Sequence, residues 1–163
     1  MSEADAVPEV VLNMPARAEG VGVVRQALAG LADALAFDAA VLSDMKMAVT
    51  EACTNVVVHA YDDEPGLLAV AMAAGEDDLT IVVRDHGSGI APKPARTEPP
   101  ALGLGLPLIA ALTDSFELRG SAGKGTEVRM TFSFLRDSDP ADANPVPGSV
   151  GPDGRWNPGE PPA

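Results

Sequence analysis

The chain of 163 residues has little cysteine, little positive charge and few aromatic residues. Its single cysteine, Cys53, excludes an internal disulfide and favours a reducing compartment. Eleven Lys and Arg stand against 24 Asp and Glu, which gives a formal net charge of −13. Because a surface this acidic repels nucleic-acid phosphates and anionic lipid, we expect no direct binding to nucleic acid or to a membrane.

The sequence also lacks a recognisable targeting or membrane-spanning segment. Its first ten residues, MSEADAVPEV, have neither the basic region nor the apolar stretch of a signal peptide. The apolar runs near residues 67–74 and 101–112 are too short to cross a bilayer. We therefore expect a cytoplasmic protein.

The chain does contain enough apolar material for one globular domain, since 46% of its residues are hydrophobic. We assign residues 1–6 to a flexible N-terminus, residues 7–136 to the folded domain and residues 137–163 to a tail. The tail holds seven of the fifteen prolines and five acids against one Arg155, a composition that predicts disorder. Trp156 within it is either a stray exposed aromatic residue or a short docking element.

The spacing of apolar residues predicts how the domain folds. Helical periodicity indicates helices, alternation indicates strands, and Asp38 is a plausible N-cap for the second helix. In chain order we expect a strand (7–14), two helices (18–35 and 38–60), a hairpin (67–73 and 79–84), a short helix (104–112) and two strands (115–119 and 126–135). Because the strands fall mainly in antiparallel pairs and the helices can cover one face, this order predicts an α+β two-layer sandwich.

The second predicted helix carries Glu51, Asn55 and His59 at intervals of four, so we expect all three on one face. A Glu carboxylate can take up a proton, and an Asn carbonyl oxygen can bind a metal ion. His59 is either a satisfied buried histidine or a ligand, and a zinc site with Glu51 lacks a third ligand at recognisable spacing. Cys53 lies off this face and is interpreted as a small core residue.

Asp85 ends an apolar strand and is followed closely by Gly87 and Gly89. Its carboxylate either accepts a hydrogen bond from an exocyclic amine, such as that of adenine, or bonds the backbone of its own turn. At the level of the sequence both alternatives stay open. His86, beside it, is expected to face solvent.

Gly103 and Gly105 stand where a loop rich in proline and glycine, residues 86–102, meets the short predicted helix. Free backbone N–H groups at a helix start attract an anion, and glycine lets a phosphate approach closely. The same glycines also fit a loop and helix cap without a ligand. A loop of this length is usually a lid or a disordered segment. Taken together with Glu51 and Asn55, the two glycine motifs predict a nucleotide-binding protein.

Four motifs in this order resemble those of the GHKL, or Bergerat-fold (HATPase_c), ATPases. The resemblance is closest to the small anti-sigma-factor serine/threonine kinases of bacterial partner-switching systems, and it covers roughly residues 8–135. The motifs are the N-box Glu51-Ala-Cys-Thr-Asn55…His59-Ala60-Tyr61, the glycine boxes Asp85-x-Gly87-x-Gly89-Ile90 and Leu102-Gly-Leu-Gly-Leu106…Ile109, and the terminal Gly123-Lys-Gly125-Thr126-Glu-Val128. Membership would imply a mostly antiparallel mixed sheet with helices on one face.

The resemblance also implies a role for each matching residue. Asn55 would ligate the Mg²⁺ that bridges the ATP phosphates, and Glu51 would act as general base toward the attacking hydroxyl. Asp85 would bind the adenine amine, helped by Thr126 through water. The glycines that would let a lid close over the nucleotide are Gly87, Gly89, Gly103 and Gly105.

The function implied by the resemblance is that of an ATP-dependent serine/threonine protein kinase and anti-sigma factor. Its substrate would be a STAS-type anti-anti-sigma protein, its second partner a sigma factor, and its assembly a homodimer. The alternative is a nucleotide-binding module that sequesters a partner without kinase activity. The presence of both Glu51 and Asn55 argues against this alternative, because such a module needs neither a base nor a metal ligand.

Overall fold

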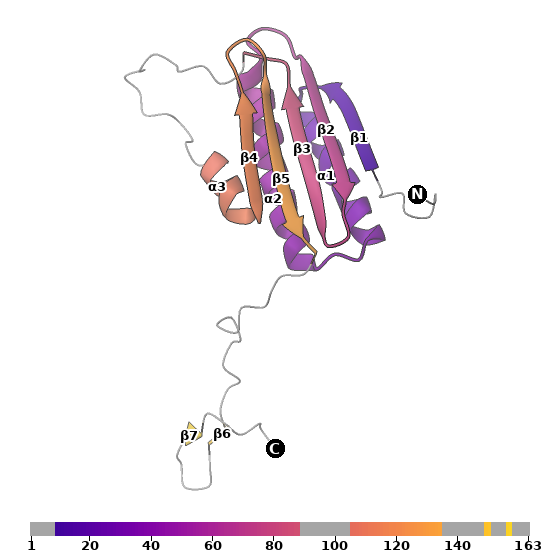
Figure 1. Cartoon of the computed structure of the whole chain (residues 1–163), viewed down its shortest axis with the longest axis vertical. Helices are drawn as coiled ribbons and strands as arrows, with labels where there is room; N and C mark the ends of the chain where they lie inside the picture. Colours follow the sequence, from indigo (N-terminus) through magenta and orange to yellow (C-terminus); the bar gives the residue numbers. More distant parts are fainter. Residues whose placement is uncertain (1–8, 89–104, 135–148, 151–155, 158–163) are drawn as a thin grey trace.

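The computed structural model of the chain describes residues 9–88, 105–134, 149–150 and 156–157 (Figure 1). Between Glu9 and Ser133 its helices and strands follow the predicted order, with boundaries that differ by a few residues at most. The π-helical turn at the end of the second long helix and the two short strands after residue 148 were not predicted. The elements in chain order are β1 (Glu9–Pro15), α1 (Ala18–Ala34), α2 (Ala39–Asn55), the π-helical turn η2 (Val56–Ala60), β2 (Leu67–Ala74), β3 (Asp78–Asp85), α3 (Gly105–Leu112), β4 (Ser115–Gly120) and β5 (Thr126–Ser133), with the short β6 (Ser149–Val150) and β7 (Trp156–Asn157).

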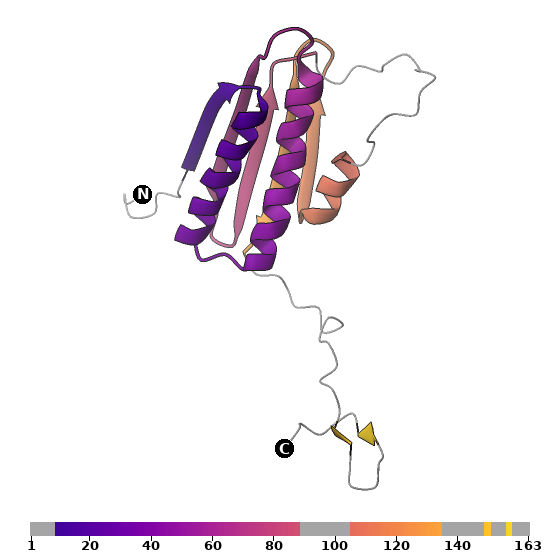
Figure 2. The ribbon, with the colours of Figure 1, turned by 180° about the vertical axis from the view of Figure 1, so that it is seen from behind.

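Five of the strands form one sheet in the order β1-β2-β3-β5-β4, and each neighbouring pair in it is antiparallel. Figure 2 shows α1 and α2 lying side by side across one face of this sheet, with α3 beside α2. The opposite face carries no helix in the described part of the chain and is turned toward the viewer in Figure 1. The predicted α+β two-layer sandwich is confirmed. The parallel pairing that a mixed sheet would include does not occur among the described strands.

The core lies between the helices and the covered face of the sheet. Strand side chains alternate between the two faces, so every second residue of β2, β3 and β5 points toward the helices and is buried. Each large apolar side chain buried in this way contributes about 1.5–3 kcal/mol. The largest fully buried side chains are Phe132, Leu28, Met45, Leu68, Met72, Leu79, Ile81, Ile109, Met130, Val24, Val49 and Val70.

The turn between α1 and α2 joins the two long helices and fixes where α2 begins. The Asp38 carboxylate accepts a hydrogen bond from the Ala40 backbone N–H at 2.7 Å, which confirms the predicted N-cap. Just before it, Ala36 adopts a positive φ of 53°, a conformation that side-chain-bearing residues rarely take. Ala36 is thus a strained residue in an exposed turn.

We expect Ala36→Gly to raise the free energy of unfolding by up to about 1 kcal/mol, because glycine takes a positive φ without the steric cost of a Cβ. The matched control is Ala29→Gly inside α1, which should lower that free energy by about 1 kcal/mol. Urea unfolding followed by circular dichroism measures both. Destabilisation of similar size in both variants would contradict the assignment of strain to Ala36.

The predicted tail lies mostly outside the described residues, as do the predicted N-terminal segment 1–6 and the loop that contains Gly89 and Gly103. Within residues 137–163 the structure describes β6 and β7, which pair with each other in an antiparallel manner. The prediction of disorder for this segment stays a prediction. Among the described residues there is no helix of the length and apolar character that crossing a membrane requires.

Candidate functional site

Glu51 and Asn55 lie one turn apart near the end of α2, and both side chains are half-buried. The first residue of α3, Gly105, lies directly against them. A Cβ on Gly105 would stand 3.3 Å from Asn55 Nδ2, 3.4 Å from Asn55 Oδ1 and 3.4 Å from Glu51 Oε2. The structure therefore brings the second glycine motif, about fifty residues further along the chain, onto the carboxylate and amide of the first motif.

His59, the last member of the predicted alignment with Glu51 and Asn55, lies beyond the end of α2. After Asn55 the helix changes to the π-helical turn η2, which contains His59. His59 is exposed, so it is not the buried histidine considered from the sequence. No group of three potential metal ligands among His, Cys, Asp and Glu occurs in the described residues, which leaves a zinc site without support.

Cys53 is fully buried, which confirms its interpretation as a core residue. Burial raises the pKa of its thiol to about 12, because the charged thiolate is poorly solvated in the apolar interior. The thiol is therefore chemically inert at neutral pH.

Among the described residues, Asp85 is the charged residue that is buried, with 6% of its surface exposed. It ends β3 on the covered face of the sheet, directly opposite Thr126 on β5. Its Oδ1 accepts a hydrogen bond from the Gly87 backbone N–H at 2.9 Å. No hydrogen bond to Oδ2 is formed within the described residues. Asp85 thus bonds its own turn with one oxygen and keeps the other as an acceptor.

Glycines allow the backbone segments around Asp85 to pack closely. A Cβ on Gly87 would collide with the Ala60 carbonyl, and a Cβ on Gly125, where φ is +81°, would collide with the Asp85 carbonyl. Two backbone hydrogen bonds connect the same segments, from Ser88 N to Ala60 O at 3.0 Å and from Gly123 N to Ser88 O at 2.9 Å. The end of η2, the turn after β3 and the β4–β5 turn therefore form one closely packed unit.

Tyr61 holds this unit in place, although sequence reasoning gave it no separate role. Its hydroxyl donates to the Leu67 carbonyl at 2.7 Å and accepts from the His86 backbone N–H at 2.9 Å. Its ring lies against Gly66, where a Cβ would collide with it. The sequence feature that could have indicated this role is an aromatic residue with a hydroxyl group, placed shortly before a turn that contains glycine. The His86 side chain is exposed, as predicted.

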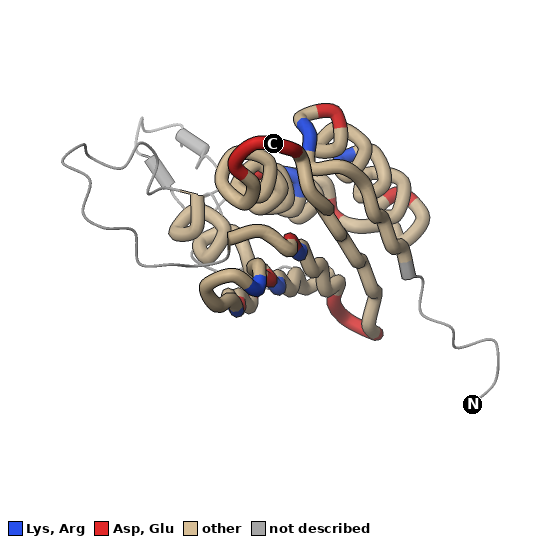
Figure 3. Tube along the Cα trace, turned by 90° about the horizontal axis from the view of Figure 1, so that it is seen from above, with Lys and Arg blue, Asp and Glu red and all other residues tan. Residues whose placement is uncertain are grey.

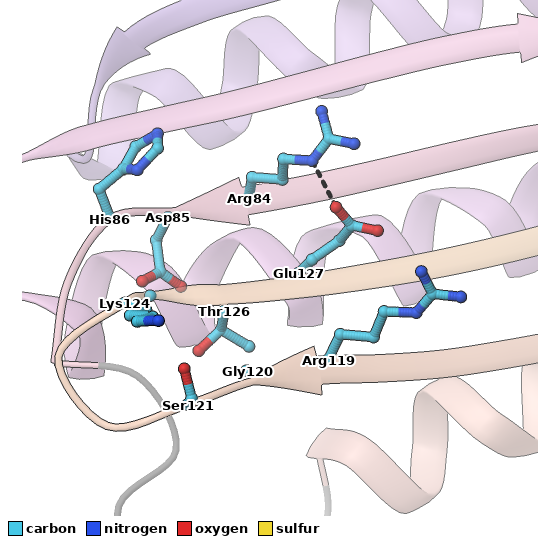
Figure 4. Close-up of a pocket in the computed structure, with 10 residues that line it drawn as sticks. Arg84, Asp85, His86, Arg119, Gly120, Ser121, Lys124, Thr126 and Glu127 are labelled. Carbon is cyan, nitrogen blue, oxygen red and sulfur yellow. Dashed lines mark hydrogen bonds and ion pairs between the residues drawn. The ribbon is translucent and has the colours of Figure 1, made fainter.

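Two pockets border these residues. One is a groove of about 300 Å³ on the helical layer, lined by Arg25 of α1 and by Ser43, Lys46, Met47, Thr50 and Glu51 of α2. The other, of about 370 Å³, lies where β3, β4 and β5 meet the β4–β5 turn, and Asp85 and Thr126 stand among its lining residues (Figure 4). Of the predicted site residues, Glu51, Asn55 and Gly105 come together in contact, as do Asp85, Gly87 and the Gly125–Thr126 pair.

The sequence profile of the family described as "Histidine kinase-like ATPase domain" matches residues 14–132, which is most of the chain. The chain belongs to this family. Among its curated relatives, a serine-protein kinase RsbW of Bacillus cereus is 35% identical over 151 residues, covering 85% of this chain and 92% of the relative. The RsbW of Bacillus mycoides is 34% identical over the same shares of both chains.

Two solved structures have a similar fold. The RsbU and RsbW domains of Rv1364c from Mycobacterium tuberculosis match with a TM-score of 0.62 and 24% identity, over 79% of this chain and 33% of that chain. The histidine kinase domain of a blue-light activated histidine kinase from Erythrobacter litoralis matches with a TM-score of 0.50 and 18% identity, over 74% of this chain and 62% of that chain.

The predicted membership of the anti-sigma-factor kinase family is confirmed, and with it the predicted enzyme class, a serine/threonine protein kinase. The predicted roles of individual residues rest on the geometry given above and are developed as proposals below.

Proposed function

We propose that this member of the histidine kinase-like ATPase family transfers the γ-phosphate of ATP to a serine or threonine of a STAS-type anti-anti-sigma protein, and that it sequesters a sigma factor. The observation that carries the kinase proposal is the contact of Gly105 with Glu51 and Asn55. A proton acceptor, a metal-binding amide and the free N–H groups of a helix start meet there. Phosphoryl transfer needs these groups more than it needs covalent chemistry.

The nucleotide would lie between two parts of the site. Asp85 Oδ2 is an acceptor for the exocyclic amine of adenine, and Thr126 stands opposite it to hold a bridging water. The phosphates would lie toward Gly105 and the start of α3, where free backbone N–H groups attract anions. Gly89 and Gly103 lie outside the described residues, and the family resemblance implies that they let a lid close over the nucleotide.

The residues at Gly105 fit a hard divalent cation. Asn55 and Glu51 offer amide and carboxylate oxygens side by side, and Mg²⁺ prefers oxygen ligands, binding through one or two protein groups together with phosphates and water. Bound there through Asn55, Mg²⁺ would neutralise phosphate charge. A donor set of this kind does not favour a transition metal, which takes imidazole or thiolate ligands.

Glu51 would take the proton from the hydroxyl of the protein substrate while the oxygen of that hydroxyl forms a bond to the γ-phosphorus. The bond from that phosphorus to the bridging oxygen breaks in the same step, and ADP leaves with the released electron pair. The groove of about 300 Å³ between α1 and α2 reaches Glu51 from outside and gives a protein substrate access to it. Arg25 and Lys46 line this groove and would favour an acidic segment beside the acceptor.

Binding of ATP by calorimetry tests the nucleotide site. We expect Asn55→Ala and Asp85→Asn each to weaken binding at least about tenfold in the presence of Mg²⁺, because each removes a partner of a charged or metal-linked group. When Mg²⁺ is chelated, the wild type and Asn55→Ala should bind ATP equally weakly. The Asp85→Asn variant should bind more weakly still, since adenine recognition does not use the metal.

The matched controls are Asn13→Ala, on the exposed edge of β1, and Asp33→Asn, at an exposed position of α1. Both should bind ATP like the wild type. An affinity for ATP in Asn55→Ala equal to that of the wild type, or no binding of ATP to the wild type, would contradict the proposed site. The sigma factor, the STAS-type protein and the homodimer come from the family resemblance, and copurification with each partner and sedimentation of the chain alone would test them.

A further inference from the structure

The open face of the sheet carries a cluster of positive charge at one end. The described residues include seven Lys and Arg, of which Arg17, Arg25 and Lys46 belong to the helical layer, while Arg84, Arg119, Lys124 and Arg129 lie on β3, β4, β5 and the β4–β5 turn. In Figure 3 the blue positions on these strands lie close together along the trace of the sheet. Such grouping is unexpected in a chain with a net charge of −13.

Strand register explains the grouping. Arg84 pairs with Glu127 across β3 and β5, and Arg119 pairs with Glu127 across β4 and β5, so all three side chains stand on the open face. Arg129 follows two residues later on the same face. We call Arg84, Arg119, Lys124 and Arg129 the basic cluster.

The cations of the basic cluster outnumber the neighbouring carboxylates. Arg84 donates to Glu127 at 2.6 Å, Arg129 stands 3.9 Å from the same carboxylate, and Arg119 pairs with Glu117 at 2.8 Å. The neighbouring Arg84 holds the pKa of Glu127 below its usual range, so this carboxylate stays charged. Glu117, Glu127 and Asp85, which lines the same pocket, are thus three carboxylates beside four cations, and Lys124 has no ion pair within the described residues.

The cluster surrounds a hollow that can hold a ligand group. Arg84, Arg119 and Lys124 line the pocket of about 370 Å³, together with Ser121 and the backbone of Gly120 and Gly125 (Figure 4). The side chains of Arg84, Arg119 and Arg129 remain 49%, 69% and 41% exposed, so an anionic partner can reach them. Asp85 and Thr126 of the proposed nucleotide site line the same pocket.

The chain itself contains a segment of matching charge. Residues 137–163 carry Asp137, Asp139, Asp142, Asp153 and Glu160 against a single Arg155. This segment follows β5, the strand that contributes Arg129 to the cluster and Thr126 to the pocket. Because the acidic segment and the basic cluster belong to one chain, their effective concentration is high, and even a weak attraction is enough for docking.

The length of the segment also fits. From the end of β5 back to the pocket, the chain must cover about eight strand residues, or roughly 25 Å. An extended chain spans about 3.3 Å for each residue, so the eight residues from 135 to 142, which include three acids, are long enough to reach the basic cluster from Phe134. Asp153 and Glu160 lie further along the chain, so the chain is also long enough for them to reach the cluster.

We propose that the acidic segment 137–163 of this chain docks on the basic cluster of its own sheet. The attraction is electrostatic, so docking weakens as salt screens the charges. The inference does not depend on the proposed kinase activity, because the docked state can be detected without ATP or a substrate.

Paramagnetic broadening in the full chain tests this docking. A nitroxide label is attached at Ala143→Cys, between the acids of the segment, and the amide signals of Gly120–Gly125 are recorded. The native Cys53 needs no replacement, since its thiol is buried and its pKa is raised to about 12. We expect these amides to broaden at low salt and to recover at about 1 M salt, where the Debye length falls to about 3 Å.

Charge variants decide whether the basic cluster is responsible. The double variant Arg119→Glu with Lys124→Glu should lose the broadening. The control Arg17→Glu with Arg25→Glu makes the same charge change at exposed positions of the helical layer and should keep it. No broadening in the wild type, or broadening that survives the double variant, overturns the proposal. Broadening that appears only between a labelled chain and a second, isotope-labelled chain also overturns it, and assigns the cluster to another copy.

Discussion

Replacement of Glu51 by Gln is expected to slow phosphate transfer by about 10²–10⁴-fold, the usual contribution of a general base. Binding of ATP should stay close to that of the wild type. Glutamine keeps the size and shape of the side chain beside Gly105 but cannot take up the proton of an acceptor hydroxyl at neutral pH. The expected result is therefore a protein that binds nucleotide and fails in the chemical step.

Two measurements on the same variant separate these effects. Calorimetry gives the affinity for ATP, and single-turnover transfer of labelled phosphate to the STAS-type substrate gives the rate of the chemical step. The control Glu19→Gln removes a carboxylate from an exposed position in the first turn of α1 and should leave both values unchanged. A transfer rate near that of the wild type in Glu51→Gln would show that another group accepts the proton.

The sequence was sufficient to predict the layers of the fold, because the patterns that define them are local. Apolar spacing identified α1 and α2, alternation identified the strands, and Asp38 marked the start of α2. The N-box and the glycine motifs were also local patterns, and their order indicated the family before the contact between Gly105 and Glu51 was known.

Other features depend on long-range packing that no local pattern contains. The π-helical turn η2 begins with Val56, Val57 and Val58, whose apolar character fits an α-helix equally well, so the sequence predicted one continuous helix to Ala60. The basic cluster combines residues from position 84 to position 129, and only the pairing of β3, β5 and β4 brings them together. Tyr61 likewise gained its role from contacts with His86 and Leu67.

The Gly125→Ala variant should lose about 3 kcal/mol or more of unfolding free energy, along with most of its affinity for ATP. Two costs combine at this position. Alanine would have to adopt a φ of +81°, and its Cβ would collide with the Asp85 carbonyl. Relief of this collision must move the end of β3 or the start of β5, and so separate Asp85 from Thr126. Urea unfolding and ATP calorimetry measure the two losses.

The neighbouring Gly123 supplies a control that separates these two costs. Its φ of +75° is nearly the same, but a Cβ there would meet no atom within 4 Å. Gly123→Ala should therefore lose only about 1 kcal/mol, the cost of the backbone conformation alone, and should bind ATP nearly as well as the wild type. If both variants lost the same stability, strain at the turn would explain the need for glycine. A loss confined largely to Gly125→Ala would instead trace it to the close packing against Asp85, the residue proposed to recognise adenine.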